Sequence, residues 1–107
     1  MGPEAKVEAF LVKEVKLQGG LCVKNKGTRG FPDRTVILNG ATVFVEVKAE
    51  GEEPRPEQIR VFKQIISQGG VVFVIDSKEQ VIEFMVFMMS DYEEEESVIV
   101  LPGNMVH

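Results

Sequence analysis

Asp33, Glu46 and Lys48 have the residue types and the spacing to form a metal site in the first half of the chain. If a hairpin places Asp33 opposite Glu46, their Cβ atoms lie roughly 5 Å apart on one sheet face, where like charges repel. Lys48 follows Glu46 by two residues, so its side chain leaves the same face of the strand. A hard divalent cation is the natural occupant of such a site.

The hairpin is predicted from the Asn39-Gly40 step, which separates two β-rich runs. A type I′ turn needs positive φ at both central residues, and Asn-Gly meets that need. With a two-residue loop, Leu38 pairs with Ala41 and counting outward brings Asp33 opposite Glu46. A slip of one residue would put the two carboxylates on different faces.

The flanking residues predict the elements that must position this hairpin. Pro at an early helix position, Gly-Gly pairs after helical runs, and short apolar runs mark the boundaries. The expected order is helix, three strands, helix, strand, followed by a further helix and a short strand, in one α/β domain. The expected ranges are helix 3–18, strands 21–26, 34–38 and 41–49, helix 56–68, strand 71–75, helix 77–89 and strand 97–101.

Two polar residues interrupt apolar helix faces and become candidate site residues. Glu8 shares a face with Leu11 and Val15, and Gln58 shares one with Phe62. The structural alternatives are a boundary carboxylate that reaches water for Glu8, and a buried amide bonded to the backbone for Gln58. Both alternatives stay open at this point.

The distribution of charge, more than its sum, bears on nucleic-acid binding. The net charge of −5 argues against binding driven by charge alone, but five acids are concentrated in residues 91–96. That acidic run reads as a solvated loop. Basic residues flank the two motifs, so a DNA-binding rim around the carboxylates is expected. Its members are Lys24, Lys26, Arg29, Arg34, Arg55 and Arg60.

Several other chemistries lack the residues they need. Cys22 is the single cysteine and His107 the single histidine, so neither a disulfide, a zinc cluster nor a Ser-His-Asp triad is supported. There is no phosphate-binding or dinucleotide-binding glycine motif, and no organic cofactor is expected. No apolar segment approaches the ~20 residues of a membrane span, and no leader is seen, so a cytoplasmic protein without membrane contact is expected.

These motifs together resemble the virus-type replication-repair nuclease (VRR-NUC) domain, of the Pro-Asp…(Asp/Glu)-x-Lys nuclease superfamily. The resemblance covers residues 7–75, with 76–107 as a C-terminal extension in a single domain 1–107. It implies a restriction-endonuclease-like fold with a central mixed sheet flanked by helices. It is carried by Glu8, the segment 30–33 (Gly-Phe-Pro-Asp), the segment 46–48 (Glu-Val-Lys) and Gln58.

The resemblance also implies the roles of these residues. Asp33, Glu46 and the backbone carbonyl of Val47 would hold Mg²⁺ or Mn²⁺, with Glu8 as an additional candidate ligand. Lys48 would orient the attacking water or stabilise the transition state, and Gln58 would position Lys48 or a phosphate. Cleavage would leave a 5′-phosphate and a 3′-hydroxyl.

The same resemblance implies the substrate and the assembly. Stand-alone viral relatives act as dimers on branched DNA, so a homodimer that cuts four-way (Holliday) junctions is expected, in a host cytoplasm if the source is viral. The apolar run 84–89 is a candidate dimer surface, and burial against the chain's own sheet is its alternative. Two other functions stay open: a non-catalytic module that binds branched DNA or supports assembly, and a plain structural or regulatory α/β domain.

Overall fold

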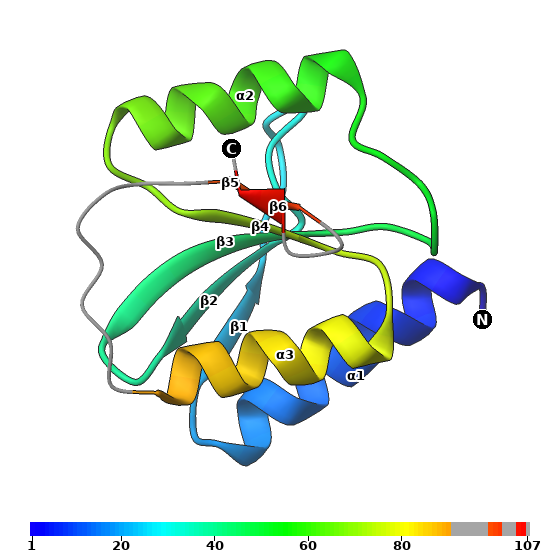
Figure 1. Cartoon of the computed structure of the whole chain (residues 1–107), viewed down its shortest axis with the longest axis vertical. Helices are drawn as coiled ribbons and strands as arrows, with labels where there is room; N and C mark the ends of the chain where they lie inside the picture. The colour runs from blue at the N-terminus through cyan, green and yellow to red at the C-terminus, as the bar shows by residue number, and fades with distance from the viewer. Residues whose placement is uncertain (91–98, 102–104, 107) are drawn as a thin grey trace.

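The computed structural model describes residues 1–90, 99–101 and 105–106 (Figure 1). The acidic run 91–96 and the expected start of the last strand at residues 97–98 lie outside the described residues.

The element order agrees with the predicted nuclease core. Helix, three strands, helix and strand follow one another in the first 75 residues, and a third helix comes next. Boundaries differ from the expected ones by one or two residues. The described elements are α1 (Pro3–Leu17), β1 (Leu21–Lys24), β2 (Arg34–Leu38), β3 (Ala41–Val47), α2 (Pro56–Ser67), β4 (Val72–Ile75), α3 (Lys78–Met89), β5 (Ile99–Leu101) and β6 (Met105–Val106).

The strands form one mixed sheet with helices on both faces. Its order is β1-β2-β3-β4-β5-β6, with parallel pairing of β3 with β4 and of β4 with β5, and antiparallel pairing elsewhere. Helices α1 and α3 lie side by side on one face, and α2 lies on the other (Figure 1). β3 therefore runs through the middle layer, with its side chains facing α1 and α3 on one side and α2 on the other.

The β2–β3 hairpin has the predicted turn and register. Asn39 and Gly40 have φ of 51° and 81°, both positive as a type I′ turn requires. Leu38 pairs with Ala41, and the register continues to Arg34 opposite Val45. The Asn39 side chain also donates a hydrogen bond of 3.0 Å to the carbonyl of Met88, which ties the turn to the end of α3.

Two apolar clusters lie on opposite faces of the sheet. Alternation along β3 sends Val43, Val45 and Val47 towards α1 and α3, and sends Phe44 towards α2. The larger cluster joins α1 and α3 to the sheet, and the smaller one is centred on Phe62 of α2. Of the expected dimer run 84–89, the side chains of Phe84, Met85 and Met88 are buried in the larger cluster.

No helix in the described part of the chain is long and apolar enough to span a membrane.

Candidate active site

Glu46 and Lys48 occupy the face of β3 that α2 covers. The intervening residue, Val47, points to the opposite face and joins the larger core cluster. Burial is nearly complete, with 2% of Glu46 and 8% of Lys48 exposed. The ammonium nitrogen of Lys48 lies 3.4 Å from Oε2 of Glu46. The polar pair thus sits at the end of a central strand, where charge is costly unless it is paired.

Gln58 of α2 bridges this pair. Its Oε1 accepts a hydrogen bond of 2.8 Å from Nζ of Lys48, and its Nε2 donates one of 2.8 Å to Oε2 of Glu46. The same Oε1 accepts from the backbone N–H of Arg55 at 2.9 Å, at the start of α2. Gln58 therefore fixes the lysine and the carboxylate relative to each other and to the first turn of the helix. Of the buried-amide alternative, the bond to backbone is present, whereas the side chain of Gln58 is only half-buried.

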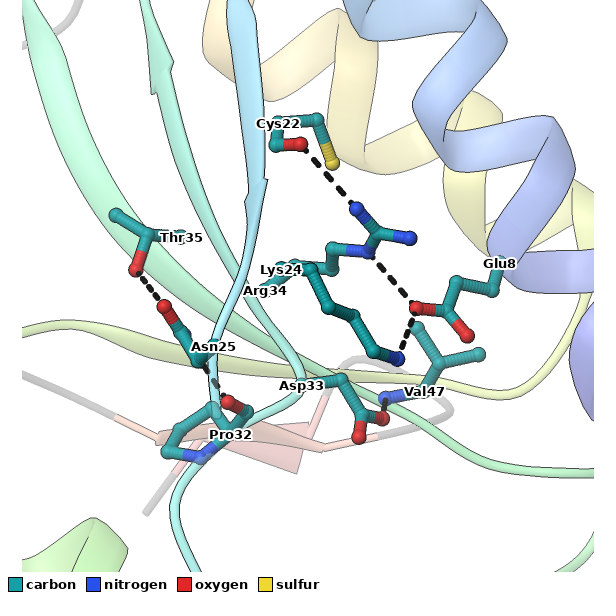
Figure 2. Close-up of polar contacts among 9 residues, drawn as sticks. All are labelled: Glu8, Cys22, Lys24, Asn25, Pro32, Asp33, Arg34, Thr35 and Val47. Atoms are coloured by element: carbon teal, nitrogen blue, oxygen red, sulfur yellow. Dashed lines mark hydrogen bonds and ion pairs between the residues drawn. The ribbon is translucent and has the colours of Figure 1, made fainter. Parts of the chain in front are cut away.

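Asp33 reaches the site from the segment just before β2. Its Oδ2 accepts a hydrogen bond of 3.0 Å from the backbone N–H of Val47 (Figure 2). Asn25 fixes the approach, because its side chain donates to the carbonyl of Pro32 at 3.0 Å and its N–H donates to the carbonyl of Asp33 at 2.9 Å. The side chain of Asp33 is thus held beside the end of β3, as the hairpin register predicts.

The electrostatics of Glu46 reflect this crowding. The pKa of Glu46 is raised to about 7, first by burial and then by the neighbouring charge of Asp33, against the lowering effects of Lys48 and Gln58. Among the described residues, Oε1 of Glu46 is buried without a hydrogen-bond partner. A buried oxygen without a partner is expensive, and a second negative charge nearby adds to the cost. A cation at this position would remove both costs.

Two carboxylates and one backbone carbonyl are available as oxygen donors at the end of β3. The N–H of Lys48 donates to the carbonyl of Ile75 in β4 at 2.9 Å. Since a trans peptide points its C=O opposite to its N–H, the carbonyl of Val47 points away from β4, towards Asp33. Carboxylates of Asp33 and Glu46 with this carbonyl are the hard oxygen donors that Mg²⁺ and Mn²⁺ prefer. The residues present therefore fit such a metal ion.

Glu8, the additional candidate ligand, pairs with two cations, and its role as a metal ligand stays a prediction. It lies on the α1 side of the sheet, where its Oε2 accepts from Nζ of Lys24 at 2.7 Å and from Nε of Arg34 at 2.8 Å (Figure 2). Burial favours the neutral acid, but these two hydrogen bonds outweigh it and lower the pKa of Glu8. Within the described residues, no three acidic, histidine or cysteine side chains are placed to hold one metal ion.

The predicted basic rim is split by the same arrangement. Lys24 and Arg34 are engaged by Glu8 on the α1 side of the sheet. Arg29 contacts Glu57 of α2 at 3.2 Å and keeps 86% of its side chain exposed. The remaining three cations are exposed and form no ion pair with another described residue: Lys26, Arg55 and Arg60.

Sequence reasoning missed Glu4, one helical turn before Glu8. Burial raises the pKa of Glu4, the charge of Asp33 raises it further, and Lys48 lowers it, so its carboxylate is within electrostatic reach of the site. The apolar periodicity of α1 contained a signal for this, since residues four apart share a helix face. The periodicity did not indicate which of the two glutamates lies at the end of the sheet that carries Asp33 and Glu46.

Asp76 was missed as well, because it directly follows a strand and looked like a loop residue. Its carboxylate is buried and accepts a hydrogen bond of 3.1 Å from the N–H of Gly51, and its own N–H donates to Oε1 of Gln80 at 2.7 Å. Asp76 thereby anchors the loop that follows Lys48, and it anchors this loop to the C-terminal end of β4.

The comparisons with known proteins agree with this geometry. No family model matches the chain. A curated relative from Acyrthosiphon pisum secondary endosymbiont phage 1, named "Putative nuclease p44", is 44% identical over an alignment of 79 residues that covers 71% of this chain and 85% of the relative. A solved structure described as a VRR_NUC domain is 33% identical, with a TM-score of 0.72 over 80% of this chain and 97% of that one.

The raised pKa of Glu46 predicts a pH-dependent stability. The folded chain binds this proton more tightly than the unfolded chain, whose carboxyl has the ordinary pKa of 4.5. The resulting stabilisation is complete below that value and is lost as the pH rises through about 7, which costs about 3 kcal/mol in the absence of metal. Glu46→Gln should match the stability of the native chain at about pH 4.5 and be more stable than it at about pH 8.

Urea unfolding of both proteins in EDTA at the two pH values measures this difference. Other titrating groups are common to both chains and cancel. Parallel pH dependences for the two proteins would contradict the assignment.

Proposed function

The chain belongs to the VRR-NUC family of nuclease domains, and from this premise we propose that it is a divalent-metal-dependent endonuclease that hydrolyses phosphodiester bonds in branched DNA. One observation carries the proposal: Glu46, beside Asp33, has a buried oxygen without a hydrogen-bond partner among the described residues, while Lys48 is held next to it by Gln58. A purely structural ion pair would need neither the second carboxylate nor the unpartnered oxygen.

Asp33, Glu46 and the carbonyl of Val47 are the proposed ligands of Mg²⁺ or Mn²⁺. When bound, the metal ion would supply a water of lowered pKa and charge neutralisation at the scissile phosphate. Gly-Phe-Pro before Asp33 and the contacts of Asn25 hold one carboxylate in place. The strand holds the other carboxylate, so little reorganisation is needed when DNA binds.

Lys48 is the proposed catalytic cation. Its ammonium group has three donors, of which one is used by Gln58 and another faces Glu46. The remaining donor can bind a non-bridging phosphate oxygen or the attacking water. In the reaction the water oxygen forms a bond to phosphorus, the bond from phosphorus to O3′ breaks, and O3′ receives a proton. The products are a 5′-phosphate and a 3′-hydroxyl.

Gln58 is the positioning residue in this scheme. It contacts both Lys48 and Glu46 and does not need to contact DNA. Glu8, in the same scheme, neutralises Lys24 and Arg34 and joins α1 to the β1–β2 edge of the sheet. The exposed cations Lys26, Arg29, Arg55 and Arg60 are the proposed phosphate contacts.

A homodimer is proposed because α3 leaves an apolar stripe exposed. Ile82, Val86 and Met89 follow helical spacing, and Val86 is 67% exposed. Such a stripe on a small domain fits contact with a second copy. Because a two-fold axis repeats each active site once, a dimer could cut opposite strands of a four-way junction symmetrically.

Cleavage assays test the catalytic proposal. Labelled four-way junction, flap and linear duplex should be cut in Mg²⁺ or Mn²⁺ and left intact in EDTA, with the junction and flap preferred. Lys48→Met should lower kcat roughly 10²–10³-fold, because it removes a charge that acts on the transition state. Lys13→Met, on the exposed side of α1, is the matched control and should retain activity.

Metal-independent cutting, or full activity of Lys48→Met in a folded protein, would contradict this mechanism. Binding of junction DNA without any cutting would instead favour the non-catalytic binding module.

Sedimentation tests the homodimer. Val86→Glu places a charge on the exposed stripe and should shift the protein to monomer, because burying an unpaired carboxylate in an interface is costly. Ile37→Glu is the control, since Ile37 is also exposed but lies on the opposite face of the sheet. Equal sedimentation of Val86→Glu and the native chain would exclude this stripe as the interface.

A further inference from the structure

An uncharged cleft lies beside the candidate active site on the same face of the sheet. Its volume is about 500 Å³, and its apolar walls are Phe31, Phe44, Val61 and Ile65. We call it the aromatic cleft. Phe31 and Phe44 are half-buried and meet edge to face, with ring centroids 5.5 Å apart at an angle of 84°. Two aromatic rings in edge-to-face contact are therefore partly exposed in one wall.

The aromatic cleft is built from the segments that carry the catalytic residues. Phe31 precedes Asp33 by two residues, and Phe44 precedes Glu46 by two on the same face of β3. Two strand residues span about 7 Å, a distance that one nucleotide can cover. The opposite wall is α2, which supplies Gln58 one turn earlier. A DNA strand whose phosphate lies at Glu46 would thus pass the mouth of the cleft.

The polar groups of the cleft suit a neutral planar ligand. Gln64, Gln68 and Thr28 line it, and none of the described residues that line it is charged. Each glutamine amide has both donors and an acceptor, as the edges of nucleobases also do. Aromatic walls provide stacking, which tolerates any base. A free phosphate or a carboxylate would find no charged partner inside.

Charge at the rim supports the same occupant. Arg29 follows Thr28 and Arg60 precedes Val61, and both arginines are exposed. The loop that carries Arg29 packs closely on α2, since a Cβ at Gly30 would lie 3.0 Å from Cγ2 of Val61. Cationic side chains therefore flank an uncharged cleft, which matches the sugar-phosphate backbone on either side of a base.

We propose that the aromatic cleft binds an unstacked nucleobase of the nucleotide next to the scissile phosphate. The proposal rests on the proposed nuclease function and deepens it. Unstacking is least costly where pairing is already broken, as at a branch point or flap. The cleft would therefore contribute to the preference for branched DNA, by rewarding substrates that present a free base at the cutting site.

Fluorescence of 2-aminopurine tests this inference. The chain has no tryptophan, so the probe can be excited with little protein background. 2-Aminopurine is placed in a junction on either side of the mapped cleavage position. Binding is measured in EDTA, where no cutting is expected. The native chain should raise the fluorescence at one of the two positions, because the probe leaves the base stack. A Gln64→Ala/Gln68→Ala double variant should raise it less.

An abasic substitution at the same position completes a double-mutant cycle. The native chain should bind and cut the DNA with the base about ten-fold better than the abasic DNA, as expected for two lost hydrogen bonds. The double variant should discriminate less between the two substrates, because stacking on Phe31 and Phe44 remains. Gln18→Ala is the control, because Gln18 is an exposed glutamine at the far end of α1.

The outcomes separate this inference from the nuclease proposal. Cutting with no 2-aminopurine signal and no base preference would overturn the cleft proposal and leave the nuclease intact. Loss of dimer in the double variant, with an unchanged base preference, would assign the cleft to a second copy of the chain instead. A native chain that neither binds nor cuts DNA would overturn both.

Discussion

The repulsion between the half-buried Asp33 and the buried Glu46, at the end of a central strand, is the constraint on which the site depends. Burial and the nearby carboxylate raise the pKa of Glu46 to about 7, and its Oε1 has no partner among the described residues. Lys48 and Gln58 reduce this cost but do not remove it. The fold thus holds a local arrangement that is poor for stability and suited to binding a cation, as functional sites often are.

The sheet keeps this arrangement apart from a second polar cluster. Glu8, Lys24 and Arg34 neutralise one another on the α1 side, whereas Glu46, Lys48 and Gln58 face α2. Strand alternation alone makes this division, because neighbouring residues of β2 and β3 point to opposite faces. As a result Lys24 and Arg34 are committed to Glu8, and the exposed arginines around α2 are the proposed contacts for DNA.

Short sequence patterns were sufficient to predict the structure where a residue type favours one local conformation. Asn39-Gly40 accepts the positive φ of a two-residue turn, and that turn alone determines the register that brings Asp33 to β3. Gln58 was also found, because a polar residue on an apolar helix face needs a partner. Glu4 was missed, since helical periodicity defines a face but not how far the helix slides along the sheet, and that packing brings Glu4 towards the site. The role of Asp76 depends on the adjacency of β3 and β4, which no local sequence pattern encodes.

The most direct test of the account is Mn²⁺ binding to the native chain without DNA, measured by calorimetry near neutral pH. The account predicts a site that releases a proton on binding, because the metal displaces the proton from a carboxyl whose pKa is about 7. Asp33→Asn and Glu46→Gln should each abolish the binding, while Glu8→Gln should retain it. Binding that survives both changes, or that is lost with Glu8 alone, would contradict the claim that Asp33 and Glu46 form the metal site.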